Sequence, residues 1–241
     1  AAVLVAAGCT SSESAASSEQ EAGAPLPTIG LDSEFVPGVV SGGADVRAIS
    51  ADEVDTIVMI GDSITVASTE ALEAEFAALG FDDPVIVSAV GKRMAESLSN
   101  NPSGAAIAEF LSAPTEDDAD GLGDEHGDEL WIVALGTNDI GQYSEASEVA
   151  VDVDEVLARV PPDAPLVWVD TYIRDRTDGT ALVNDVITAR IEQRGNAVVA
   201  PWSFFAGGEG VMRSDGVHPS ESGTQVFAGV VSLTAARFLG R

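Results

Sequence analysis

The sequence is poor in cysteine and in basic residues, and each shortage excludes something. Cys9 is the only cysteine, so no disulfide bond can form within the chain. Only 11 residues are Lys or Arg against 40 that are Asp or Glu, and Lys92 is the single lysine. The resulting formal charge of −29 repels phosphate backbones, so we expect no nucleic acid partner. Hydrophobic residues nevertheless make up 45% of the chain, which excludes the disordered class for its main body.

The chain opens with a run of small apolar residues, 1–8 (AAVLVAAG), that stops at Cys9. This run is too short to span a bilayer, which needs ~20 apolar residues, and it is typical of the end of a secretory signal peptide. Residues 5–9 (VAAGC) also resemble a bacterial lipobox, although Ala6 stands where a bulky aliphatic residue is usual. The resemblance implies that Cys9 is lipidated and that the protein is exported and lipid-anchored on the extracytoplasmic side of a bacterial cell membrane. The alternative is a plain secretory signal with an incidental cysteine.

Composition divides the rest of the chain into a linker and one domain. Residues 10–45 contain mainly Ser, Ala, Glu, Gly and Pro and too few bulky apolar side chains to offset the entropy of ordering, so they predict a flexible linker. We expect the domain at 46–241. Its acidic segment 115–129 begins like a calcium loop at Glu116, Asp118 and Asp120, but the twelfth position is Gly127 rather than Glu. A solvated loop is therefore favoured, and no metal site is predicted.

Short apolar runs alternate with helix-like stretches throughout the domain. Strands are predicted at 56–60, 84–90, 130–135, 165–170 and 197–199. Helices are predicted at 69–79, 103–111, 144–160, 180–194 and 220–239. The strands are almost continuously apolar, as strands covered on both faces are, and the alternation indicates an α/β fold with a mostly parallel, doubly wound sheet of five strands. Active sites of such sheets lie at the carboxyl ends of the strands.

Two short motifs supply the residues of a catalytic triad. Ser63 follows the first predicted strand in the segment 61–65 (GDSIT), where backbone amides can receive developing negative charge. Asp215 and His218 lie three residues apart in 215–219 (DGVHP), a spacing that lets the carboxylate hold the imidazole while its other nitrogen takes the serine proton. The only other histidine, His126, lies in the acidic segment and is read as a surface residue.

Two further polar positions follow predicted strands and are candidates for an oxyanion hole. Gly91 follows the second strand, and Asn138 follows the third in 136–139 (GTND). A glycine lets a substrate carbonyl approach a backbone N–H, and the Asn138 side-chain amide can donate a second hydrogen bond. Together with the Ser63 N–H, they would give three donors, although Gly91 and Asn138 taken singly are more often ordinary turn residues.

In this order, the four motifs resemble the conserved blocks of the SGNH hydrolases, also called the GDSL family. The matching residues are Ser63, Gly91, Asn138 and His218, with Asp215 completing the last block. The resemblance spans about residues 56–239 and implies a three-layer α/β/α fold, no cofactor, and ester hydrolysis through an acyl-serine intermediate. Ser63 lies in GDSI rather than GDSL, which keeps an aliphatic side chain at that position.

Two alternatives to an esterase of short acyl groups on carbohydrate or lipid stay open. The chain also resembles, more faintly, the extracellular catalytic domains of peptidoglycan O-acetyltransferases, at 184–185 (Asn-Asp) and 201–202 (Pro-Trp). The second alternative is a noncatalytic binding lipoprotein. Four residues near predicted strand ends could line a substrate pocket or serve only in packing and surface pairing: Arg93, Trp168, Tyr172 and Arg174.

Overall fold

The computed structural model describes residues 54–113 and 128–240. The predictions for Cys9, for the linker at 10–45, for the domain start at 46 and for most of the acidic segment, including His126, lie outside these residues. Within them, no helix is long and apolar enough to cross a membrane.

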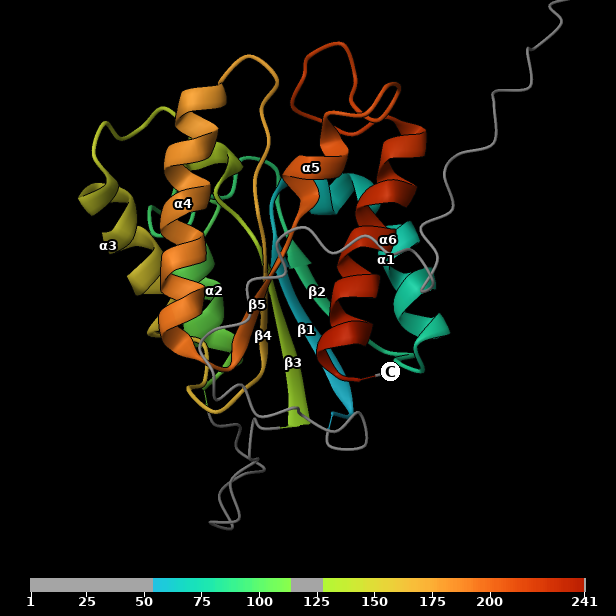
Figure 1. Ribbon diagram of the computed structural model, residues 1–241. Helices are drawn as coiled ribbons and strands as arrows, with labels where there is room; N and C mark the ends of the chain where they lie inside the picture. The colour runs from blue at the N-terminus through green and yellow to red at the C-terminus, as the bar shows by residue number, and fades with distance from the viewer. Residues whose placement is uncertain (1–53, 114–127, 241) are drawn as a thin grey trace, which may run out of the picture.

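The five predicted strands form one parallel sheet. They are β1 (Thr56–Gly61), β2 (Val85–Ser88), β3 (Glu129–Ala134), β4 (Leu166–Val169) and β5 (Ala197–Ala200). Their order across the sheet is β2-β1-β3-β4-β5, and every neighbouring pair is parallel. All strands therefore end at the same edge, which is the upper edge in Figure 1.

Helices cover both faces of the sheet, so the three-layer α/β/α fold is confirmed. The helices are α1 (Ser63–Ala78), α2 (Gly104–Leu111), α3 (Ala146–Leu157), α4 (Thr177–Arg194), α5 (Trp202–Ala206) and α6 (Glu221–Phe238), with a 3-10 turn, η4, at Thr137–Asp139. Figure 1 shows α1, α5 and α6 on one face and α2, α3 and α4 on the other. The helix α1 begins six residues earlier than predicted, because the Asp62 side chain caps it by accepting the Ile64 N–H.

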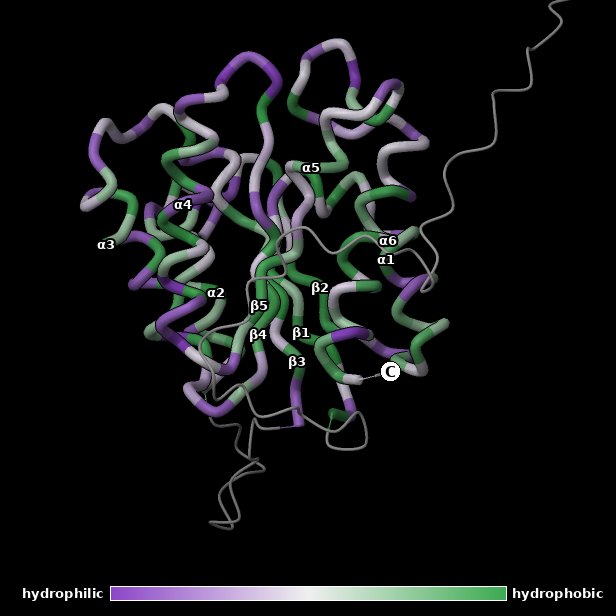
Figure 2. Tube along the Cα trace, in the orientation of Figure 1, coloured by the Kyte–Doolittle hydropathy of each residue, from purple (hydrophilic) through white to green (hydrophobic). Residues whose placement is uncertain are grey.

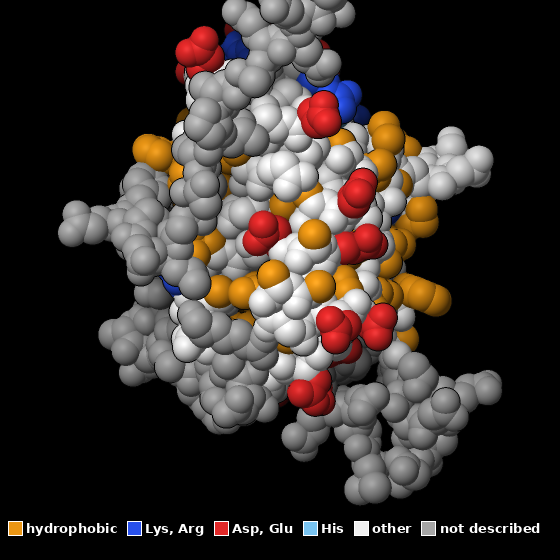
Figure 3. Space-filling model, turned by 90° about the vertical axis from the view of Figure 1, so that its right-hand side faces the viewer, with side chains coloured by type: hydrophobic (Ala, Val, Ile, Leu, Met, Phe, Trp, Pro, Cys, Tyr) orange, Lys and Arg blue, Asp and Glu red, His pale blue; other side chains and the backbone are white. Residues whose placement is uncertain are grey.

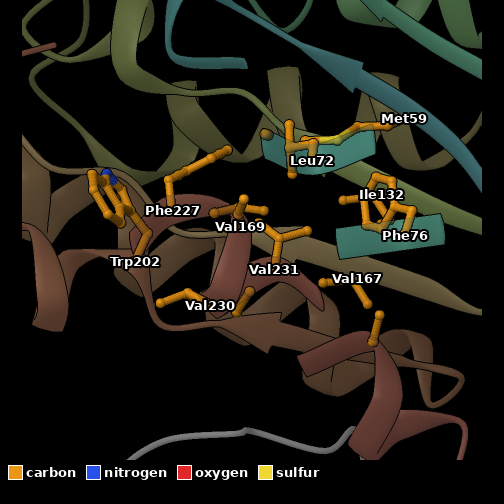
Figure 4. Close-up of a cluster of buried hydrophobic side chains, with 14 of the residues drawn as sticks. Met59, Leu72, Phe76, Ile132, Val167, Val169, Trp202, Phe227, Val230 and Val231 are labelled. Atoms are coloured by element: carbon orange, nitrogen blue, oxygen red, sulfur yellow. The ribbon is translucent and has the colours of Figure 1, made fainter. Parts of the chain in front are cut away.

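Two apolar clusters, one on each face of the sheet, make up the core. The strands supply side chains to both, which explains why they read as continuous apolar runs; Figure 2 shows them as the most hydrophobic part of the trace. On the α1/α6 face, Trp202 and Phe227 meet edge to face with their ring centroids 5.2 Å apart (Figure 4). This packing fixes α5 and α6 against the sheet and so positions the loop that joins them.

Candidate active site

Ser63 is the first residue of α1 and comes two residues after the end of β1. Its Oγ lies 3.0 Å from Nε2 of His218, which is 155 positions away in the sequence. Its backbone N–H belongs to the first helical turn, where no intrahelical acceptor exists, and it has no other acceptor in the described part of the chain. The hydroxyl thus has a base beside it, and the amide is free to receive a negatively charged oxygen.

His218 and Asp215 lie in the loop between α5 and α6. His218 Nδ1 is 3.0 Å from Asp215 Oδ2, while Asp215 Oδ1 accepts the N–H groups of Val217 and His218, both at 2.9 Å. These backbone hydrogen bonds, together with the imidazole, hold the pKa of the exposed Asp215 carboxyl well below its usual range. The carboxylate stays charged, binds Nδ1 and leaves Nε2 facing Ser63.

The structure places Asn138 between the Ser63 turn and the Gly91 loop. Its Nδ2 donates to Asp62 Oδ2 at 3.2 Å and to the Lys92 carbonyl at 3.0 Å. Both N–H bonds of the amide are therefore engaged, which differs from the expectation of a free donor. Gly91 has φ +74°, the left-handed region that favours glycine, and its N–H has no acceptor among the described residues.

Lys92 fixes the loop that carries Gly91. The side chain is buried, with 2% exposed, and Nζ donates to the Pro102 carbonyl at 2.7 Å and to Asn101 Oδ1 at 3.3 Å. Asn101 in turn donates from Nδ2 to the Val90 carbonyl at 3.0 Å. Burial without a carboxylate partner lowers the pKa of Lys92. Sequence reasoning did not assign this residue a role, and the only signal was that it is the single lysine.

Two buried aspartates near the site were also not assigned a role from the sequence. Burial raises the pKa of Asp62, next to Ser63, to about 6, against the opposing effect of the Ile64 N–H bond. Burial raises the pKa of Asp139 to about 7, and its carboxylate accepts the Met94 N–H at 3.3 Å. Each aspartate hydrogen-bonds a neighbouring loop. Asp62 lies next to Ser63 in the first motif and Asp139 lies next to Asn138 in the third, where the sequence pointed only to the serine and the asparagine.

Residues 59–226, more than half of the chain, match the GDSL-like Lipase/Acylhydrolase family. The chain belongs to this family. It is thus an esterase or acylhydrolase of the GDSL type, and the SGNH resemblance seen in the sequence is confirmed at the level of the family. No curated protein sequence matches the chain significantly.

Solved structures of GDSL-type and related enzymes share the fold. TesA is 19% identical, with a TM-score of 0.55 over 76% of this chain and 99% of that chain. A carbohydrate esterase family 3 protein from Talaromyces cellulolyticus is 18% identical, with a TM-score of 0.56 over 77% and 98%. The C-terminal catalytic domain of the Streptococcus pneumoniae peptidoglycan O-acetyltransferase OatA is 18% identical, with a TM-score of 0.51 over 78% and 93%. At these identities, the likeness shows the fold.

Of the four candidate pocket residues of this GDSL enzyme, three are engaged in packing, in a buried hydrogen bond or in an ion pair. Trp168 is fully buried and donates from Nε1 to the Leu135 carbonyl at 3.2 Å. Tyr172 packs partly buried against the core, and Arg93 pairs with Glu96. Arg174 is exposed beside the His218 loop, and its Nη2 donates to the Arg213 carbonyl at 3.2 Å. Residues 54–113 and 128–240 contain no group of three His, Cys, Asp or Glu side chains that could hold a metal ion.

Proposed function

We propose that this GDSL enzyme is an extracytoplasmic serine esterase that hydrolyses carboxylic esters through an acyl-Ser63 intermediate, with short acyl groups on carbohydrate or lipid as substrates. The observation that carries the proposal is the continuous array in which Ser63 Oγ lies 3.0 Å from His218 Nε2 and His218 Nδ1 lies 3.0 Å from Asp215. Such an array activates a serine hydroxyl at neutral pH.

The reaction follows from these contacts. Ser63 Oγ attacks the acyl carbonyl carbon while His218 Nε2 takes the hydroxyl proton, and Asp215 stabilises the imidazolium that forms. The carbonyl oxygen becomes an oxyanion, which the N–H groups of Ser63 and Gly91 stabilise. His218 then gives its proton to the departing alcohol oxygen. Water, activated by His218, attacks the acyl-Ser63 ester, and the acid leaves as Ser63 regains its proton.

Asn138 is proposed as the third oxyanion donor through an exchange of partners. Of its two hydrogen bonds, the one to Asp62 is longer, at 3.2 Å against 3.0 Å for the Lys92 carbonyl. The developing oxyanion competes for this N–H with Asp62, whose other carboxylate oxygen, Oδ1, already accepts the Ile64 N–H at 2.9 Å. The Lys92 bond keeps the amide in place while the other N–H turns to the substrate.

Two observations support short acyl groups. Val66, one turn along α1 from Ser63, and Val90, next to Gly91, expose 43% and 71% of their surfaces, so small apolar side chains are accessible near both residues. Two structures of the same fold are named as a carbohydrate esterase and as an acetyl esterase with acetate ion. These names select the first substrates to test, acetylated sugars and simple acetates.

The membrane anchor is proposed from the sequence around Cys9. Two or more acyl chains on a lipidated cysteine give stable membrane attachment. The test is fractionation of cells that produce the chain from its native precursor, beside a Cys9→Ala variant. The wild type is expected in the membrane fraction with incorporated fatty acid, and the variant is expected to lose both. Equal fractionation of the two proteins would argue against the anchor.

Acyl transfer to a glycan is the second candidate, and the structure weakens the residue matches that suggested it. Asn184 accepts the Thr171 N–H at 2.9 Å and the Thr171 hydroxyl at 2.8 Å, so it ties α4 to the end of β4. Trp202 is a core residue, with 1% exposed. These side chains have structural partners, and hydrolysis is therefore preferred.

Hydrolysis of p-nitrophenyl esters of increasing acyl length tests the proposed function, with the full-length chain in mild detergent and a Ser63→Ala variant as control. We expect turnover that is greatest for acetate and at least ~10³-fold lower in the variant. Including a glycan acceptor with free hydroxyl groups in the same assay separates the candidates, because a transferase would form acylated acceptor in preference to free acid. Equal activity of both proteins would contradict a Ser63 nucleophile.

A further inference from the structure

Most basic side chains in the described part of the chain form ion pairs with carboxylates or hydrogen bonds to backbone carbonyls. Three arginines form ion pairs: Arg93 with Glu96, Arg159 with Glu155, and Arg190 with Asp154. Arg194 donates to the carbonyls of Leu157, Pro161 and Ala164, and Lys92 is buried in its loop. This pairing is what a chain with 40 acidic residues predicts, because an exposed arginine has a carboxylate within easy reach.

Arg174, Arg176 and Arg213 differ, because within residues 54–113 and 128–240 none of them forms an ion pair with a carboxylate. All three are exposed. Asp175 lies between the first two in the sequence and pairs with neither. The guanidinium charges of these three residues are thus left for solvent or for a ligand.

Two of these arginines form backbone hydrogen bonds with the turn that carries Asp215 and His218. The Arg174 backbone N–H donates to the Gly216 carbonyl at 2.9 Å, and the Arg213 N–H donates to the His218 carbonyl at 2.8 Å. Arg174 Nη2 also donates to the Arg213 carbonyl at 3.2 Å. A side chain at Gly216 would lie 2.8 Å from the Arg174 Cβ, which shows how closely the two loops pack. Figure 1 shows them beside each other above the upper edge of the sheet.

Figure 3 looks onto the α1/α6 side, where carboxylates are spread over the face and the few basic side chains in view lie mainly near its upper end, beside carboxylates. A chain of net charge −29 repels anions in general, so an anionic substrate needs local cations to bind. Arginine suits this purpose because its planar guanidinium binds carboxylate and phosphate oxygens in pairs.

We propose that Arg174 and Arg213 bind an anionic group, a carboxylate or a phosphate, on the alcohol part of the ester substrate. The proposal rests on the proposed esterase function and names the substrate class within it. The alcohol part is chosen because His218 protonates the departing oxygen, so this part of the substrate lies on the side of the His218 loop. Gly91 and Asn138, which face the carbonyl oxygen, belong to other loops.

Binding an anion here also favours the chemical step. His218 becomes positively charged when it takes the Ser63 proton, and unpaired guanidinium groups on the adjoining backbone disfavour that charge. An anionic group on the substrate neutralises them while it is bound. An anionic substrate is therefore expected to raise kcat as well as lower KM, and the preference is expected to weaken as salt screens the charges.

The test compares matched acetyl esters with the full-length chain. The pair is 4-acetoxybenzoate, which carries a carboxylate on the alcohol part, and its methyl ester, which is neutral. A third ester, 4-acetoxyphenyl phosphate, carries a phosphate on the alcohol part. A fourth, 4-nitrophenyl hydrogen succinate, carries its carboxylate on the acyl part instead. Each is assayed with the wild type, with the Arg174→Gln/Arg213→Gln double variant and with Arg190→Gln. Glutamine keeps a donor for the Arg213 carbonyl, and Arg190 is the control because it pairs with Asp154.

We expect the ratio of kcat/KM between 4-acetoxybenzoate and its methyl ester to fall about 25-fold in the double variant and to stay constant in Arg190→Gln, since each of the two exposed charged hydrogen bonds contributes about a fivefold effect. A larger fall for the phosphate ester would identify phosphate as the anion. An unchanged ratio, whether neither ester or both esters slow, or a fall only for the succinate ester would overturn the inference. Absence of turnover on every ester, p-nitrophenyl acetate included, would overturn the proposed function as well.

Discussion

Asp215 allows a test of how His218 is held, because its two carboxylate oxygens have different partners. Oδ1 accepts two backbone N–H groups at 2.9 Å, and Oδ2 lies 3.0 Å from His218 Nδ1. In an Asp215→Asn variant, the amide oxygen takes the Oδ1 position because the two N–H groups need an acceptor. The amide NH₂ then faces Nδ1, so the imidazole proton moves to Nε2. In that tautomer, His218 cannot accept the Ser63 proton.

The size of the effect follows from the same contacts. Turning the amide the other way would lose both backbone hydrogen bonds, at about 1 kcal/mol net each. The competent arrangement then lies about 2 kcal/mol higher, which reduces its population roughly 30-fold. An Asp215→Ala variant lets water solvate Nδ1 and leaves both tautomers accessible. Since the Asp215 side chain is 48% exposed, its charge is screened, and we expect only about a tenfold to hundredfold loss in the Ala variant.

The assay is the initial rate of p-nitrophenyl acetate hydrolysis at one fixed pH for the wild type and both variants. The expected order of kcat is wild type, then Asp215→Ala, then Asp215→Asn, with about 30-fold between the two variants. Thermal melting of the variants checks that the loop between α5 and α6 stays folded. An Asn variant as active as the Ala variant, or more active, would refute the tautomer argument.

Three further variants test the loops around the site. Asn138→Ala removes the proposed third oxyanion donor and is expected to lower kcat about 10² to 10³-fold with little change in KM, and a pure KM effect would contradict that role. Lys92→Met removes a buried charge, which limits the loss of stability, but it also removes the hydrogen bonds that hold the Gly91 loop. We therefore expect kcat to fall about tenfold while the melting temperature stays within a few degrees. A large fall in the melting temperature together with the fall in kcat would indicate a merely structural lysine. Asp139→Asn tests the pKa of about 7 that burial gives Asp139. The folded state binds this proton more tightly than the unfolded state, so the wild type loses stability as the pH rises from about 4 to about 7, and the variant is expected to gain more in melting temperature at about pH 8 than at about pH 5.

The sequence predicted all five strands because buried parallel strands leave continuous β-branched runs. The ends were less certain: β2 stops at Ser88, where the prediction ran to residue 90, since Ala89 and Val90 are apolar but lie in the loop before Gly91. The helix α1 starts at Ser63 because of the Asp62 cap, which periodicity does not register. The helix α5 and the turn η4 have only 5 and 3 residues, too few for any period to appear.

For the site, chain order and spacing were enough to predict that Ser63, Asp215 and His218 meet. The partners of Asn138 were beyond prediction, because they depend on how the Ser63 turn and the Gly91 loop approach in space. The burial of Lys92 depends likewise on Asn101 and Pro102 folding back over it. Contacts of this kind join loops that are distant in the sequence, and no local pattern encodes them.

The most direct test of the central role of Ser63 is covalent labelling with a fluorophosphonate, followed by peptide mapping in a mass spectrometer. A serine activated by His218 attacks phosphorus as it attacks an acyl carbonyl, so we expect one adduct per chain, located on Ser63. Labelling should be absent in Ser63→Ala and strongly slowed in His218→Ala. An adduct on another serine, or undiminished ester turnover in Ser63→Ala, would contradict the proposed mechanism.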